Sequence, residues 1–296
     1  MIIWRFTDGK PGHEKQTLGL ARALLKLRPG KCIDLPAPRR SAAIRQWILA
    51  HFPAGNDLPT PDILLGAGHA THFALLAARR AYGGKAVVLM KPSLPLSWFD
   101  LCIIPEHDDP PLRDNVIITR GALYCVIPSD KHAPSLGLIL VGGPSPHFQW
   151  NTDSIQAQIR DLVRHHSNLH WRLTTSRRTP ADFLDALAAP DIECIPSDST
   201  ETGWLESQLE KARVAWVTPD SVSMVYESLT AGCHVGLFDL KANAGSRVAK
   251  GILGLRANGH LVSTSTLSTS LGSNQGLPHF NEAERCAEII EKRWLQ

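Results

Sequence analysis

Long hydrophobic runs are missing from this sequence of 296 residues. No apolar stretch approaches the roughly 18 residues that a membrane-spanning helix needs, so we expect no transmembrane segment. The first eight residues do not resemble a secretion signal, because Arg5 interrupts their apolar stretch and no cleavage site follows. We therefore expect a cytoplasmic protein.

Paired cysteines and a large charge excess are missing too. The six cysteines have no CxxC spacing and most lie in or beside apolar segments, which indicates reduced core thiols rather than disulfides or zinc. The formal net charge of +3 is too small to indicate nucleic-acid binding. With 43% hydrophobic and 20% charged residues, the composition is typical of a folded globular protein and excludes a disordered one.

Short apolar runs alternate with stretches of helical periodicity, which predicts an α/β protein with repeated β-loop-α units and parallel sheets. In the first half, strands are expected at residues 2–6, 32–35, 63–65, 86–89, 101–104 and 116–118, and helices at 14–27, 41–51 and 69–81. The polar, proline-bounded stretch 128–134 predicts a linker. We accordingly expect domains at residues 1–133 and 134–280.

The second half repeats the pattern. Strands are expected at residues 136–141, 169–174, 192–195, 214–217 and 235–238, and helices at 152–166, 180–188, 203–211 and 221–231. Residues 263–276 are rich in Ser, Thr and Gly, which predicts a loop before a final helix at 281–294.

Ligands of open parallel sheets bind beyond the carboxyl ends of the strands, so the loops that follow strands are candidate sites. The loop Thr7–Gln16 contains Asp8, Lys10, Gly12 and His13 and leads into a helix whose first N–H groups suit an anion. It contains neither the dinucleotide fingerprint nor a P-loop. A plain turn with His13 near the helix cap explains the same residues equally well.

Two further loops with histidine follow strands of the first half. Gly66–His72 is rich in small residues, which are also common where a helix packs closely on a sheet, and His107-Asp108 forms a polar tip. These loops contain no HxxxH or HxH pair with supporting carboxylates, so we expect no metal site.

Three polar loops of the second half predict a phosphate cradle. Hydroxyls, helix-start N–H groups and guanidinium groups bind diphosphate, and the candidates are Gly143, Ser145, Ser176, Arg177, Arg178, Asp220, Ser221, Ser223 and Met224. Glu227, six residues after Ser221, is placed to accept hydrogen bonds from a ribose diol. Helix capping and a solvated arginine pair explain each loop alone, whereas three such loops in register favour phosphate binding.

Four motifs together resemble one family. They are Thr7-Asp8-Gly9-Lys10-Pro11-Gly12-His13-Glu14, Gly142-Gly143-Pro144-Ser145 with His147, Phe148 and Trp150, Thr175-Ser176-Arg177-Arg178-Thr179-Pro180, and Asp220-Ser221-Val222-Ser223-Met224. This combination resembles the Elm-type mitochondrial fission family, whose bacterial members are often labelled nucleoside-diphosphate-sugar epimerases. The resemblance runs from about residue 2 to residue 240.

The resemblance implies two Rossmann-like domains similar to GT-B glycosyltransferases, with an interdomain cleft and the donor site in the C-terminal domain. It also implies that the final helix, at residues 281–296, crosses back to the N-terminal domain. Gly9–His13 looks like a variant of the glycine-rich loop of GT-B enzymes that transfer N-acetylglucosamine to a lipid acceptor, and Ser221–Glu227 looks like their donor-site helix start. Tyr226, Ser228 and Gly232-Cys233-His234 depart from the family pattern, which leaves the sugar and the nucleotide open.

We expect a metal-independent, GT-B-like glycosyltransferase without a cofactor, which takes a nucleoside-diphosphate sugar, with UDP among the carriers to test. His13 is the candidate general base, because an inverting transfer needs a proton acceptor near neutral pH, and Asp8 is the reserve. Lys10 and Gly12 are expected to contact substrate. Two alternatives stay open: a GT-B epimerase of nucleotide sugars, and a non-catalytic scaffold protein of the fission family.

One predicted helix near residues 38–52 combines basic and apolar side chains. They are Arg39, Arg40, Ile44, Arg45, Trp47, Ile48, His51 and Phe52. Interfacial helices have this composition, which predicts peripheral contact with the inner face of the membrane and would suit a lipid-linked acceptor. Packing of the same stripe on the sheet is the commoner arrangement and remains the alternative.

Overall fold

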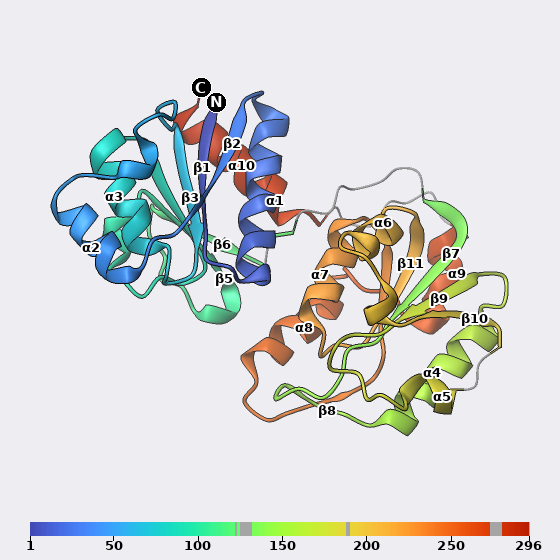
Figure 1. The fold of residues 1–296 in the computed structure, drawn as a ribbon. Helices are drawn as coiled ribbons and strands as arrows, with labels where there is room; N and C mark the ends of the chain where they lie inside the picture. The colour runs from blue at the N-terminus through green and yellow to red at the C-terminus, as the bar shows by residue number, and fades with distance from the viewer. Residues whose placement is uncertain (122, 125–131, 188–189, 273–279, 296) are drawn as a thin grey trace. The chain divides into compact units, whose positions relative to one another are not determined.

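The computed structural model describes the chain except for residues 122, 125–131, 188–189, 273–279 and 296 (Figure 1). It comprises two compact units, which we call unit 1 (Met1–Cys125 with Asn281–Gln296) and unit 2 (Val126–Phe280). Each is an α/β unit around a parallel sheet, which confirms the predicted fold class. The predicted linker begins outside the described residues, and strand β7 starts within it at Ala133.

Unit 1 contains a parallel sheet with the strand order β2-β1-β3-β4-β5-β6. Two of its inner strands, β3 and β5, are buried along their whole length, as expected for a sheet covered on both faces. The chain adds β2 on one side of β1 and β3 on the other, so the strand order reverses between β1 and β3. The strands are β1 (Ile2–Thr7), β2 (Lys31–Pro36), β3 (Ile63–Ala67), β4 (Lys85–Leu89), β5 (Leu101–Pro105) and β6 (Val116–Thr119).

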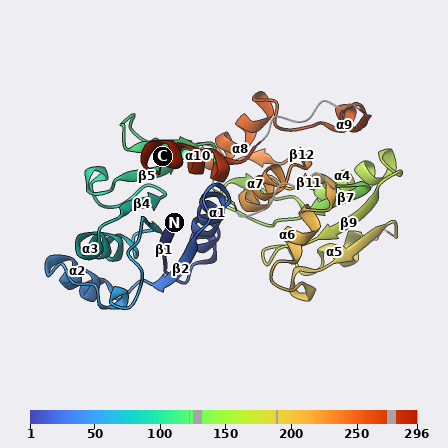
Figure 2. The same cartoon turned by 90° about the horizontal axis from the view of Figure 1, so that it is seen from above.

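Helices cover both faces of the unit 1 sheet (Figure 2). α2 (Arg40–Ile48) and α3 (His72–Tyr82) lie on one face, over Trp4 and Phe6. α1 (Pro11–Leu27) and α10 (Glu282–Trp294) lie together on the other, where Lys26 pairs with Glu284 at 2.7 Å. Short 3₁₀ turns occupy Pro53–Gly55, Leu96–Trp98 and Glu106–Asp108.

Unit 2 has a second parallel sheet, with the strand order β10-β9-β7-β11-β12. Because β9 and β11 flank β7 on opposite sides, the order reverses between β7 and β11. A small antiparallel pair, β8 with β13, stands apart from this sheet. The strands are β7 (Ala133–Leu140), β8 (Phe148–Gln149), β9 (His170–Thr174), β10 (Ile192–Ile195), β11 (Ala212–Val217), β12 (His234–Leu237) and β13 (Lys241–Ala242).

Alternation along β11 divides the unit 2 core into two layers. Val214 and Trp216 pack in the layer beneath α4 and α9, whereas the intervening residues face the side of α6 and α7. Asn151 caps α4 through a 2.9 Å bond from the N–H of Ser154. The helical segments are α4 (Thr152–His165), α5 (Phe183–Leu187), a 3₁₀ turn (Ser197–Ser199), α6 (Trp204–Leu209), α7 (Val222–Thr230), α8 (Arg247–Ala257) and α9 (Thr264–Gly272).

The prediction of a loop at residues 263–276 is wrong for the first part of this range, which forms α9. Ser263 and Thr266 form a reciprocal capping box: the Ser263 N–H donates to Thr266 Oγ1 at 2.9 Å, and the Thr266 N–H donates to Ser263 Oγ at 3.2 Å. Leu267 is fully buried in the unit 2 core, so the burial of its side chain stabilises α9 in addition to the capping box. Residues 273–276 of the predicted loop lie outside the described residues.

The basic and apolar stripe at residues 38–52 divides between core and solvent. Trp47 packs at a tilt against Phe73 and Trp98, with ring centroids 5.6 and 5.2 Å away, and Phe52 is buried against Trp4. These two side chains therefore pack on unit 1, whereas Ile48 is exposed. None of the described helices is long and apolar enough to cross a membrane.

Candidate active site

Asp8 and His13 form a hydrogen-bonded pair at the carboxyl edge of the unit 1 sheet. Asp8 Oδ2 lies 2.8 Å from His13 Nδ1, and the two side chains are 2% and 18% exposed. Because an ionised carboxylate only accepts hydrogen bonds, this contact selects the tautomer of the neutral imidazole in which Nδ1 carries the proton and the lone pair lies on Nε2. Asp8 therefore fixes the orientation of the imidazole, and the two residues predicted as the base and its reserve form one hydrogen-bonded pair. Their catalytic role stays a prediction.

The turn between β1 and α1 holds this pair in place. The Lys10 N–H donates to Asp8 Oδ1 at 3.2 Å, and the Gly9 N–H donates to Glu14 Oε1 at 3.0 Å. Pro11 starts α1 at the first helical position, which its ring favours. Lys10 and Gly12 are exposed beside His13, and their contact with substrate stays a prediction.

The Gly66–His72 loop lies across the reversal point from this turn. His13 packs on Gly68, which has φ +75°. His72 is buried, with Nδ1 3.4 Å from Ser93 Oγ, and burial together with the neighbouring His69 lowers the pKa of His72 to about 4. His72 is therefore a neutral core residue at physiological pH. Within the described residues, no three His, Cys, Asp or Glu side chains gather as a metal site.

Arg178 and Asp220 join three loops at the carboxyl edge of the unit 2 sheet. Arg178 donates to the Gly143 carbonyl at 2.8 Å and the Pro144 carbonyl at 3.1 Å, and its guanidinium lies 2.8 Å from Asp220 Oδ2. The same carboxylate oxygen accepts the N–H of Gly143 at 2.9 Å. The Gly142 N–H donates to Thr218 Oγ1 at 2.7 Å. The loops after β7, β9 and β11 are thus one bonded assembly.

Only glycine fits at both positions of the loop after β7. A Cβ on Gly142 would lie 2.2 Å from the Asp220 carboxylate, and one on Gly143 would lie 2.1 Å from the Arg178 carbonyl oxygen. Either side chain would push the three loops apart. The observed packing of the three loops therefore requires glycine at positions 142 and 143.

The other predicted residues of unit 2 lie on these same loops. Ser176 Oγ accepts the Arg178 N–H at 3.2 Å, and Ser145 Oγ accepts the His147 N–H at 3.2 Å. Arg177 and Ser223 are exposed, Met224 is half-buried and Glu227 is buried. Direct contact of each with a substrate stays a prediction. The guanidinium of Arg178, the carboxylate of Asp220 and the backbone of Gly143 already bond to one another.

The start of α7 offers free backbone N–H groups. Ser221 occupies the N-cap position with its own N–H bonded to the Thr218 carbonyl at 3.1 Å. No side chain of the described residues caps α7, so the first N–H groups of the helix are available to an anion. They lie next to the Arg178–Asp220 assembly at the point where the strand order reverses.

Sequence reasoning missed a fourth segment at this edge, which leads into α8. Asn243 Nδ2 donates to the Pro146 carbonyl at 2.9 Å, and Ser246 Oγ lies 3.0 Å from His147 Nδ1. Ser246 also caps α8 by accepting the Ala249 N–H at 3.1 Å. The available signal was a serine directly before the apolar-periodic stretch 247–257.

Comparison with known proteins gives a family and a fold. The family model of Mitochondrial fission ELM1 matches residues 11–294. An uncharacterized protein of Rickettsia prowazekii (strain Madrid E) is 22% identical, over 98% of both chains. A candidate UDP-N-acetylglucosamine 2-epimerase from Listeria monocytogenes aligns with a TM-score of 0.60 and 14% identity, over 99% of this chain and 96% of the other.

Two further solved structures are similar over nearly their whole length. The S. aureus MnaA–UDP structure aligns with a TM-score of 0.51 and 11% identity, over 99% of this chain and 96% of the other. MurG of Acinetobacter baumannii aligns with a TM-score of 0.50 and 13% identity, over 98% and 99%. The fold is therefore that of GT-B glycosyltransferases and UDP-N-acetylglucosamine 2-epimerases.

Proposed function

This chain belongs to the mitochondrial fission ELM1 family, and we propose that it is a GT-B-like glycosyltransferase with a nucleoside-diphosphate sugar as donor. The observation that carries the proposal is the reversal of strand order between β7 and β11. Open α/β sheets bind ligands at such a point, beyond the carboxyl ends of the strands. Here that point holds the uncapped start of α7 and a glycine loop.

The proposed diphosphate site uses charge and backbone together. The α7 N–H groups and the Arg177 guanidinium bind the diphosphate, while Arg178 and Asp220 hold the loops in register. The diphosphate gains charge as it leaves the sugar, and fixed donors then stabilise it more than they stabilise the bound donor. The similar MnaA structure contains UDP, which makes UDP the first carrier to test.

His13 is the proposed base. The bond between the sugar C1 and the diphosphate oxygen breaks with its electron pair on the diphosphate, and an acceptor oxygen bonds to C1. The proton of that acceptor oxygen passes to His13 Nε2. Asp8, bonded to Nδ1 at 2.8 Å, stabilises the imidazolium that results.

A thermal-shift screen with UDP, GDP, CDP, ADP and TDP and their sugar conjugates tests the donor site. A ligand at 100 times its Kd adds about 2.7 kcal/mol of stability, which raises Tm by roughly 4–5 °C in a chain of this size. Arg177→Ala should weaken binding by about tenfold, because it removes a charge-assisted hydrogen bond. Arg164→Ala, at an exposed guanidinium away from these loops, is the matched control.

Product analysis then separates the enzyme classes. Released nucleoside diphosphate together with a glycosylated acceptor supports the transferase, whereas a donor with an inverted sugar centre and no release identifies an epimerase. The absence of a shift with every nucleotide would overturn the donor site and leave a scaffold protein.

A further inference from the structure

The outer face of α2 exposes two large aliphatic side chains. Ile48 is 60% and Leu49 is 65% exposed, at the end of a helix whose inner face is buried through Ala43 and Trp47. Arg45 lies three and four residues before them and therefore on the same helical face. We call Arg39, Arg40, Arg45, Ile48 and Leu49 the α2 patch.

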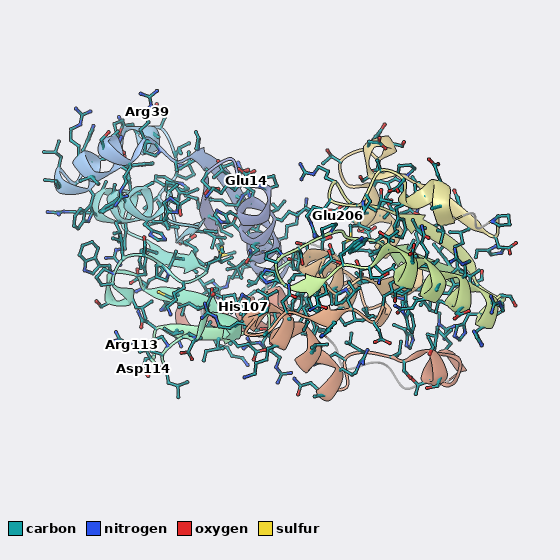
Figure 3. All side chains as sticks on the ribbon, turned by 90° about the horizontal axis from the view of Figure 1, so that it is seen from below. Glu14, Arg39, His107, Arg113, Asp114 and Glu206 are labelled. Carbon is teal, nitrogen blue, oxygen red and sulfur yellow. The ribbon has the colours of Figure 1, made fainter. Side chains whose placement is uncertain are left out.

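The α2 patch carries charge of one sign. Residues 37–54 contain three arginines and neither aspartate nor glutamate. Arg39, Arg40 and Arg45 are exposed, and none of them forms an ion pair within the described part of the chain. Figure 3 shows Arg39 extending from the start of α2 into solvent. The patch thus joins unpaired cations to exposed aliphatic groups, and the segment that carries them contains no acidic residue.

A second exposed leucine of unit 1 differs from this pattern. Leu112 is 90% exposed, but it is a single apolar side chain beside both Arg113 and Asp114. Single exposed apolar residues are ordinary on protein surfaces, whereas exposed apolar side chains grouped with cations are typical of interfacial helices. In Figure 3, Arg113 and Asp114 lie at the opposite edge of unit 1 from Arg39.

We propose that the α2 patch docks the protein on an anionic lipid bilayer. A bilayer surface offers both kinds of complementarity: anionic headgroups for the arginines, and an acyl boundary at the depth that aliphatic side chains of an interfacial helix reach. A nucleic acid would use the arginines but leave Ile48 and Leu49 exposed. The proposal does not depend on the donor site, which lies in unit 2.

Vesicle flotation of the full chain tests the proposal. We expect binding to phosphatidylcholine vesicles that contain phosphatidylglycerol and none to phosphatidylcholine alone. Replacing Arg39, Arg40 and Arg45 by glutamine should weaken binding by roughly fivefold for each arginine, because each contributes about that factor near an anionic surface. Ile48→Asp with Leu49→Asp should weaken binding at least about tenfold, since aliphatic burial is lost.

Leu112→Asp is the matched control, because it replaces a more exposed leucine outside the patch. It should bind anionic vesicles as the parent chain does. Equal Tm values for the parent and all variants establish that each is folded, as expected for exposed positions.

Three outcomes would overturn the proposal. They are failure of the parent chain to bind anionic vesicles, unchanged binding by the Ile48→Asp/Leu49→Asp variant, and equal loss in Leu112→Asp. Binding of duplex DNA that competes with vesicles and ignores the aspartate substitutions would identify a polyanion site instead. A thermal shift with nucleotides in the aspartate variant would show that the donor site is independent of the patch.

Discussion

The imidazole of His13 occupies the space in which residue 68 would carry a side chain. A Cβ on Gly68 would lie 2.3 Å from His13 Cε1, and Gly68 has φ +75°. The loop after β3 therefore sets the ring position from one side, while Asp8 sets it from the other through the 2.8 Å bond to Nδ1. Gly68 is a positioning residue for the proposed base.

Gly68→Ala should disable the base without unfolding the protein. The added methyl group collides with the His13 ring, so we expect kcat to fall toward the value of His13→Ala. Gly203→Ala is the matched control, because Gly203 also has a positive φ, of +87°, and its Cβ would meet no atom within 4 Å. In both variants alanine takes a backbone conformation that L side chains rarely adopt, so both carry backbone strain. Equal kcat values for the two would refute the positioning role.

His13→Ala should lower the rate of sugar transfer by roughly 10²–10⁴-fold, the usual contribution of a general base. Asp8→Asn should cause a loss in the same range, because asparagine can donate to Nδ1 and so move the imidazole proton to Nε2. His51→Ala, at an exposed histidine beyond α2, should keep full activity. Transfer rates measured at saturating donor give the comparison, and full turnover by both site variants would exclude this pair.

Arg178 and Asp220 should be coupled in stability. Asp220→Ala removes the partner of the buried Gly143 N–H and of Arg178, and we expect a loss of about 2 kcal/mol in the free energy of unfolding. The Arg178 side chain is 42% exposed, so solvent screens its share of the ion pair. Urea unfolding of Arg178→Ala, Asp220→Ala and the double variant tests this coupling. The double variant should lose less free energy of unfolding than the two single variants lose together.

Arg177→Ala is the control for this set of Arg178 and Asp220 variants. Arg177 is the exposed neighbour of Arg178, and its replacement should change stability by no more than about 0.5 kcal/mol while it weakens donor binding. Strictly additive losses at 178 and 220 would contradict the assembly of the three loops.

His72 should make the protein less stable as the pH falls. Its pKa is about 4 in the folded chain against 6.5 in the unfolded one, so between these values the unfolded state binds more protons. The free energy of unfolding therefore has its full value above pH 6.5 and decreases as the pH falls toward 4, by a total of about 3 kcal/mol.

His72→Gln isolates this effect, because glutamine does not titrate. Between pH 6.5 and pH 4, its free energy of unfolding should decrease by about 3 kcal/mol less than that of the parent. Denaturant unfolding at a series of pH values gives both curves. Parallel curves would exclude His72 as the source.

The elements of the sheets were predictable from sequence because their signals are local. Buried runs such as 63–65 predict strands, and β3 indeed covers Ile63–Ala67. Proline at position 11 starts α1, and Asn151 caps α4. The α9 helix escaped prediction because Ser and Thr favour loops on average, while the burial of Leu267 depends on the sheet beneath it.

The sequence by itself determined the α/β class, the strands of the two parallel sheets and the polar loops that follow them, since periodicity and turn chemistry act over a few residues. Only the tertiary structure decided the strand order, and with it that the loops after β7 and β11 meet. It also decided that Arg178 binds Asp220, and that Trp47 is covered while Ile48 is exposed. These outcomes depend on packing between residues far apart in the chain, which local propensity does not encode.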